Sequence, residues 1–145
     1  MPYDYYVDPD LDEDAIAIVP EGTRYLKLIE WEDQGETRNG DPKIKLKFQD
    51  TETRYHVNHW LSLIPKGNPG HGIAKKVLKT LAGKKLEGEQ SIDFDSYIGK
   101  IIKADIAHDD SSGKTYANII VSSLSSVQDG ENVPAAEVLN EDIPF

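Results

Sequence analysis

Cationic side chains alternate with apolar ones along a segment that has the composition of a β-strand. In the segment 43–49, Lys43, Lys45 and Lys47 occupy one set of alternate positions, and Ile44 and the other apolar residues occupy the second set. Because side chains alternate across a strand, this pattern predicts a half-buried strand whose lysines face water. Lysines neutralise phosphates, so the row is a candidate surface for a nucleic acid.

Neighbouring segments add flat rings and further cations to this candidate surface. Single-stranded nucleic acid is held by cations at its phosphates and by aromatic rings on which its bases stack. The alternative is an ordinary solvated strand face, with the aromatic residues partly buried in the core. Residues suited to binding share predicted strand faces in three segments: Lys27 and Trp31 in 24–31; Arg54, His56, Asn58 and Trp60 in 53–63; and Tyr116 and Asn118 in 114–124.

The elements that must position these residues follow a recognisable order. Turn residues separate five strand-like segments, at 24–31, 43–49, 53–63, 97–108 and 114–124, and Asn39-Gly40 is the best turn signal in a long hairpin loop at 32–42. The segment 73–81 predicts a helix, with Ile73, Val77, Leu78 and Leu81 on one face and Gly83 as its C-cap. Three strands, a helix and two strands are the order of the all-β OB-fold, a five-stranded barrel that binds oligonucleotides on its second and third strands. Another small α+β domain and an SH3-like barrel remain alternatives.

The charge distribution divides the chain into a body and two acidic ends. The 145 residues carry a net charge of −10, which would argue against nucleic acid if the charge were uniform. All 16 basic residues, however, lie in 24–114, whereas seven acids lie in 1–23 and five in 125–145. Residues 24–124 therefore hold 16 basic and 14 acidic residues, a net charge of +2. We expect an acidic arm at 1–20, one binding domain at 21–124 and an acidic tail at 125–145.

Several other functions lack the residues they require. The chain has no cysteine, which excludes disulfides and thiolate chemistry and fits a reducing compartment. His56 and His59 are three apart on a predicted strand, so they point to opposite faces and cannot hold one metal. The triplet 41–43 supplies the acid-x-Lys element of some magnesium nucleases, but no further carboxylates are placed beside it. No apolar run is long enough to span a membrane. We therefore expect no catalytic residues, no metal, no cofactor and no membrane partner.

The last six residues have a chemistry of their own. Two acids precede an Ile-Pro pair and a terminal Phe, whose ring suits an apolar pocket while its carboxylate suits Arg or Lys. This tip resembles that of bacterial single-stranded DNA-binding proteins, in which it recruits replication, recombination and repair proteins and can cover the DNA-binding surface. The resemblance implies partner-binding roles for five residues: Glu141, Asp142, Ile143, Pro144 and Phe145.

The body resembles a phage-encoded group of OB-like proteins found among replication and recombination genes. The resemblance lies in the segments 20–25, 37–42, 99–100 and 113–118. It implies a phage single-stranded DNA-binding protein that acts in the cytoplasm of a bacterial host, recruits partners through its tip and is not an enzyme. A homodimer is left open. Two alternatives also remain: an acidic adaptor or DNA mimic that binds no DNA itself, and a strand-annealing protein. The nine residues that we expect to bind nucleic acid are Lys27, Trp31, Lys43, Lys45, Lys47, Arg54, His56, Trp60 and Tyr116.

Overall fold

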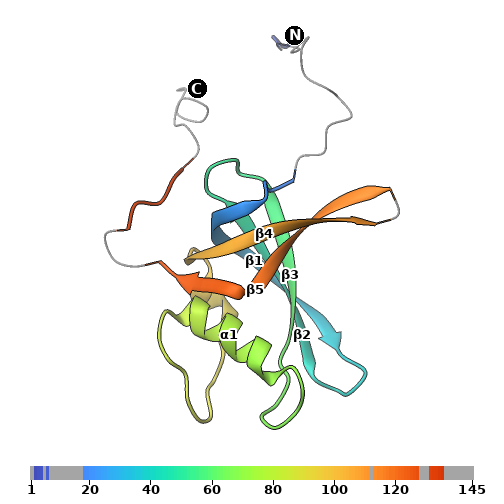
Figure 1. Ribbon diagram of the computed structural model, residues 1–145, viewed down its shortest axis with the longest axis vertical. Helices are drawn as coiled ribbons and strands as arrows, with labels where there is room; N and C mark the ends of the chain where they lie inside the picture. The colour runs from blue at the N-terminus through green and yellow to red at the C-terminus, as the bar shows by residue number, and fades with distance from the viewer. Residues whose placement is uncertain (1, 5, 7–17, 112, 128–130, 136–145) are drawn as a thin grey trace.

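Five strands and one α-helix follow the chain in the predicted order (Figure 1). The computed structural model describes residues 2–4, 6, 18–111, 113–127 and 131–135. Its elements are β1 (Gly22–Glu36), β2 (Pro42–Asp50), β3 (His56–Ser62), α1 (His71–Ala82), the short 3-10 helix η1 (Phe94–Tyr97), β4 (Ile101–Ser111) and β5 (Lys114–Ser126). Within the described ranges, no helix is both long and apolar enough to cross a membrane.

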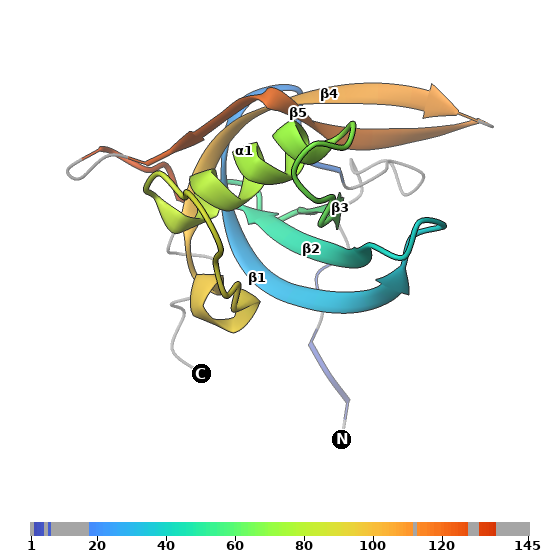
Figure 2. The same cartoon turned by 90° about the horizontal axis from the view of Figure 1, so that it is seen from below.

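The strands form one antiparallel sheet in the order β3-β2-β1-β4-β5. The two edge strands, β3 and β5, approach each other, but no backbone ladder joins them in the described part of the chain. The sheet is therefore open, and the five-stranded OB-fold barrel predicted from the sequence is not confirmed, because the sheet does not close. Helix α1 packs mainly on β5 and also contacts β3, so it bridges the two edges. Figure 2 shows α1 lying between the β1–β2 hairpin and the β4–β5 hairpin.

The core fills the inner face of the curved sheet because alternate strand residues are apolar. In β2, Ile44, Leu46 and Phe48 are buried, while the lysines between them lie on the opposite face. Helix α1 adds Ala74, Val77 and Leu81 to the same core, and Gly83 ends the helix in a left-handed conformation, as predicted. Ile73 is exposed, contrary to the predicted apolar face: the buried side of the helix is formed by Ala74, Val77, Thr80 and Leu81.

Several element boundaries differ from the sequence prediction. Strand β1 continues to Glu36, so the long loop predicted at 32–42 shrinks to a short turn in which Gly40 donates its N–H to the Thr37 carbonyl (2.9 Å). Strand β3 begins at His56 rather than at residue 53. The strand predicted from residue 97 begins at Ile101, because η1 and a left-handed Gly99 precede it.

Candidate nucleic-acid interface

The pairing of β2 with β3 places the lysine row beside the polar side of β3. Lys43 is paired with Ser62, Lys45 with Trp60, Lys47 with Asn58 and Gln49 with His56. Directly paired residues of an antiparallel sheet point to the same side, so these eight side chains share one surface. We call this surface the outer face; it is the side of β1, β2 and β3 opposite the core. Strand β1 extends it, because Lys27 is paired with Gln49.

Lys45 and Trp60 form the centre of the outer face. The Lys45 Nζ lies 5.8 Å from the centroid of the Trp60 ring, within the range of a cation–π contact. Trp60 is 51% exposed, so half of its surface is accessible to a stacking base. One pair thus offers both a cation that suits a phosphate and a half-exposed ring that suits a stacking base.

Acidic residues of β1 lie beside the lysine row and reduce its charge. Glu30 is paired with Lys47 and Glu32 with Lys45, and the Lys47 Nζ lies 3.6 Å from the Glu30 carboxylate. Exposed ion pairs of this kind are weak and are screened by salt. A phosphate can therefore replace Glu30 as the partner of Lys47 at little cost.

Trp31 does not belong to the outer face, and the prediction that it shares a face with Lys27 is wrong. A β-bulge after Leu28 inserts one extra residue into β1, so that Trp31 is paired with Leu46 of the core row. Its ring packs against Phe94, with 5.5 Å between the ring centroids, and its Nε1 donates a hydrogen bond to Asp95 (2.6 Å). The bulge reverses the alternation on which the prediction depended.

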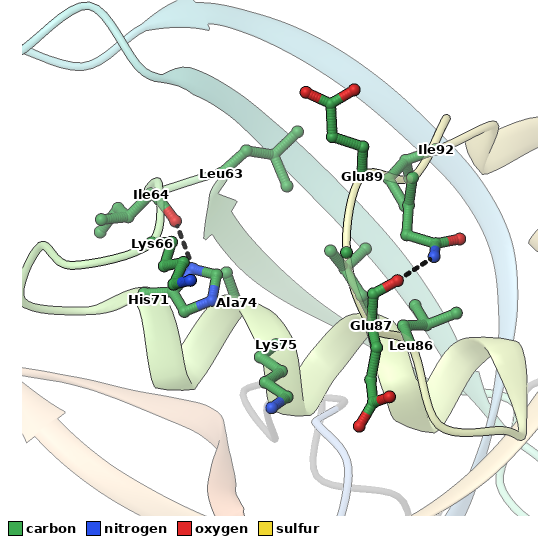
Figure 3. A pocket seen from close by; sticks show the side chains of 13 residues that line it. Leu63, Ile64, Lys66, His71, Ala74, Lys75, Leu86, Glu87, Glu89 and Ile92 are labelled. Atoms are coloured by element: carbon green, nitrogen blue, oxygen red, sulfur yellow. Dashed lines mark hydrogen bonds between the residues drawn. The ribbon is translucent and has the colours of Figure 1, made fainter.

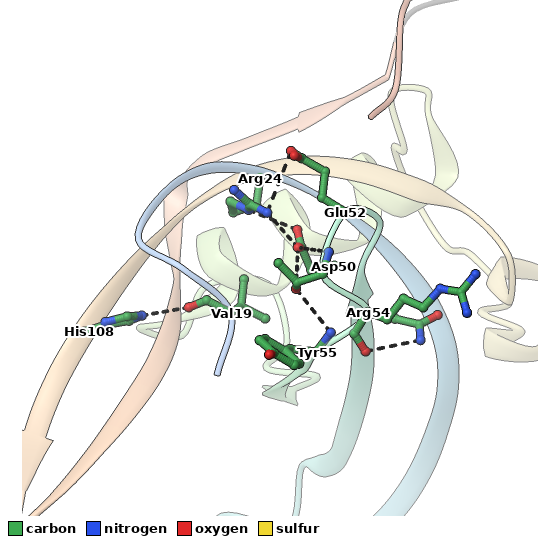
Figure 4. A network of polar contacts seen from close by, with 9 residues as sticks. Val19, Arg24, Asp50, Glu52, Arg54, Tyr55 and His108 are labelled. Carbon is green, nitrogen blue, oxygen red and sulfur yellow. Dashed lines mark hydrogen bonds and ion pairs between the residues drawn. The ribbon is translucent and has the colours of Figure 1, made fainter. Parts of the chain in front are cut away.

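A turn stabilised by a buried ion pair places Arg54 at one end of the outer face (Figure 4). The fully buried Asp50 accepts two hydrogen bonds from Arg24, at 3.0 and 2.7 Å, and two from Thr53, at 2.9 and 2.6 Å. Burial alone would raise the pKa of Asp50, but the hydrogen bonds from Arg24 and Thr53 outweigh it and lower that pKa.

Arg54 precedes β3 and has a left-handed backbone (φ 68°), so it does not share a strand face with His56 as predicted. Together with Lys27 and Gln49 it lines a cavity of about 450 Å³ beside the outer face. The structure therefore brings Arg54 close to Lys27 through the turn rather than through the strand.

Tyr116 lies apart from the lysine row. It is paired with Asp109 near the end of the β4–β5 hairpin, which extends beyond the rest of the sheet (Figures 1 and 2). Its side chain is 48% exposed and, as predicted, it lies on the same side of β5 as the exposed Asn118. The tail residues 141–145, predicted to bind partners, lie outside the described residues.

Sequence reasoning missed a second lysine–aromatic pair on the same side of the sheet. Tyr25 of β1 is paired with Lys103 of β4, whose Nζ lies 5.7 Å from the Tyr25 ring centroid. The Tyr25 hydroxyl donates a hydrogen bond to the Glu131 carboxylate, and Lys103 lies 3.2 Å from the same oxygen. The hydrogen bond to Glu131 raises the pKa of both Tyr25 and Lys103. Alternation along 24–31 places Tyr25 beside Lys27, but nothing in the sequence pairs it with Lys103.

A cavity of about 770 Å³ lies between α1, the β3–α1 loop and the 84–92 loop (Figure 3). Its walls are mainly apolar, with Leu63, Leu78 and Ile92 among them, and His71 bonds to the Ile64 carbonyl through Nδ1 (2.8 Å) at its edge. No sequence pattern predicted this cavity, because its walls come from three separate segments.

The described residues include no group of three or more His, Asp or Glu side chains that could hold a metal ion. His56 and His59 point to opposite sides of β3, as predicted, because His56 is paired with Gln49 and His59 with Leu46 of the core row. Burial lowers the pKa of His59.

Compared with known proteins, the chain matches no protein-family model and no curated sequence.

Proposed function

We propose that this protein binds single-stranded DNA without sequence specificity, through the outer face, and that it is not an enzyme. The Lys45–Trp60 pair carries the proposal, because it combines a cation and a half-exposed ring on one rigid pair of strands. Lys43 and Lys47 on β2, and Lys27 on β1, extend the cationic path along the same side. Strands fix these side chains more firmly than loops would.

The proposal includes the fold. We propose that the sheet is a variant of the OB-fold, which is a partly open Greek-key barrel that binds oligonucleotides on its second and third strands. The element order, the approach of β3 to β5 and the position of α1 against both edge strands support this assignment. The face that an OB-fold would use is the one that carries Lys45 and Trp60.

Single strands suit this surface better than a duplex does. A duplex hides the faces of its bases in the stack, whereas an unpaired strand presents them to a ring such as Trp60. Stacking is tolerant of sequence because every base has a flat face. The residues 141–145 extend the proposal to a role in phage replication or recombination, in which the tail recruits partner proteins.

Tryptophan fluorescence of the full chain tests the proposal, because the two tryptophans lie in different environments. The Trp31→Phe variant retains only Trp60, and the Trp60→Phe variant retains only Trp31. We expect oligo-thymidine to quench the first variant strongly and the second weakly, with less effect at higher salt and little effect from a duplex of equal length. A gel shift on the same samples reports binding independently of fluorescence.

Failure to shift oligo-thymidine in the gel at low salt would overturn the proposal and favour an acidic adaptor or DNA mimic. Quenching of Trp31 rather than Trp60 would move the binding surface away from the outer face. Binding combined with faster pairing of complementary strands would favour the strand-annealing alternative.

A further inference from the structure

The pair formed by Tyr25 and Lys103 repeats the chemistry of the Lys45–Trp60 pair at another place on the sheet. In each pair a lysine Nζ lies within 6 Å of an aromatic centroid, at 5.7 Å for Lys103 and 5.8 Å for Lys45. Tyr25 lies two residues before Lys27 in β1, so alternation places the two on the same side. The second pair therefore continues the outer face across β1 to β4.

An anionic group already occupies this second pair. The Glu131 carboxylate accepts a hydrogen bond from the Tyr25 hydroxyl and lies 3.2 Å from the Lys103 Nζ. A phosphate oxygen accepts hydrogen bonds from the same two donors, since a phenol and an ammonium both donate to oxyanions. Glu131 thus marks where a phosphate can sit.

The segment that carries Glu131 lies on the sheet beyond this contact. Glu131 and Val133 are partly buried, whereas Asn132 between them is exposed. Val133 and Ala135 line the 450 Å³ cavity whose other walls include Lys27 and Arg54. Residues 131–135 therefore cover the stretch of the outer face between the two lysine–aromatic pairs.

We infer that Tyr25 and Lys103 form a second subsite for a single nucleic-acid strand, and that Glu131 occupies this subsite until a phosphate of the strand replaces it. The inference rests on the proposed function, because it extends the same binding path. A short strand fills the Lys45–Trp60 region alone, whereas a longer strand must reach Tyr25 and displace the segment 131–135.

The length dependence of binding tests this subsite in the full chain. We measure the affinity of oligo-thymidines between about 4 and about 16 nucleotides, the range of site sizes of single OB-folds. For Glu131→Gln we expect affinity for the longest strands to rise at least two- to five-fold, because an exposed ion pair contributes on that scale and the Glu131–Lys103 pair is partly buried; affinity for the shortest strands should stay unchanged. The matched control is Glu89→Gln, which removes one exposed acid from the loop that lines the α1 cavity.

A second variant tests the cation of the subsite. Adding Lys103→Gln to Glu131→Gln should weaken long-strand binding and reduce the slope of log K against log salt by about 0.7, the contribution of one phosphate on a single strand. Thermal unfolding of each variant identifies any loss of folding.

The possible failures separate the two proposals. If wild type binds but Glu131→Gln matches it at every length, or if Glu89→Gln produces the same gain, the subsite is overturned and the proposed function stands. If wild type binds no strand of any length at low salt, the proposed function is overturned and the subsite with it.

Discussion

The number of cations on the outer face sets the salt dependence that binding should show. Lys27, Lys43, Lys45, Lys47 and Arg54 offer about five phosphate contacts to a strand too short to reach Lys103. Each contact on a single strand contributes about −0.7 to the slope of log K against log salt, so we expect a slope of about −3.5. Raising the salt from about 50 to about 200 mM should then weaken binding by roughly 100-fold.

Removing one lysine of the row should change the slope by a predictable amount. Lys43→Gln leaves about four contacts and should give a slope of about −2.8. Lys45→Gln should change the slope equally but weaken binding further at every salt concentration, because it also removes the cation beside Trp60. The control is Lys84→Gln, which removes an exposed charge just after α1.

Fluorescence anisotropy of a labelled oligo-thymidine, measured over a series of salt concentrations, gives these slopes directly. The intercept at high salt reports the non-electrostatic part of binding, which stacking on Trp60 should dominate. Equal slopes for the wild type, Lys43→Gln and Lys45→Gln would refute the assignment of the lysine row to phosphates. A smaller slope for Lys84→Gln would show that net charge, rather than the outer face, controls binding.

Four further predictions concern stability and the tail. Replacing the buried Asp50 by Ala removes both short hydrogen bonds of Arg24 and leaves it the longer, 3.7 Å contact with the exposed Glu52, so it should lower the free energy of unfolding by about 3–5 kcal/mol, measured by urea denaturation at pH 7. Since the pKa of Asp50 is lowered in the folded protein, its stabilisation is present above its unfolded pKa of about 3.9 and is lost as pH falls through the lower folded value. Since burial lowers the pKa of His59, the free energy of unfolding should also fall as pH drops below about 6.5. His59→Leu should therefore reduce the difference between the urea midpoints measured at about pH 7 and at about pH 5. Deleting residues 140–145 should tighten DNA binding at low salt and abolish recruitment of partners; an unchanged low-salt affinity would count against competition between tail and DNA.

The pattern of apolar and polar residues within single segments was enough to predict much of the fold and part of the candidate site. The order of the strands and helix, the lysine row of β2 and the C-cap at Gly83 depend on neighbouring residues, and each agrees with the structure. The strand assignment of 53–63 also placed His56 and Trp60 together correctly. These features need no knowledge of how distant segments pack.

The rest depends on contacts that sequence patterns do not encode. Trp31 changes sides because of a bulge, which the segment 24–31 does not signal with a glycine. Closure of the sheet depends on how closely β3 approaches β5, and the sequence predicts each strand separately. The contact of Tyr25 with Glu131 joins residues 106 apart in the chain. Each of these is a property of packing over long separations.

The net charge of −10 does not conflict with binding an anionic strand, because charge acts locally in salt. At physiological ionic strength the screening length is about 8 Å, so an acid affects the outer face only when it lies near that face. Glu30 and Glu131 do, since each contacts a lysine of the sheet. We therefore expect the acidic ends to affect binding of a nucleic-acid strand through such contacts. Replacing an acid that contacts no lysine of the sheet should leave the affinity for the strand nearly unchanged. If the proposed function holds, we expect the acidic groups that contact this modest cationic surface to limit its non-specific affinity for DNA, and stacking on Trp60 to supply a large share of the affinity that remains.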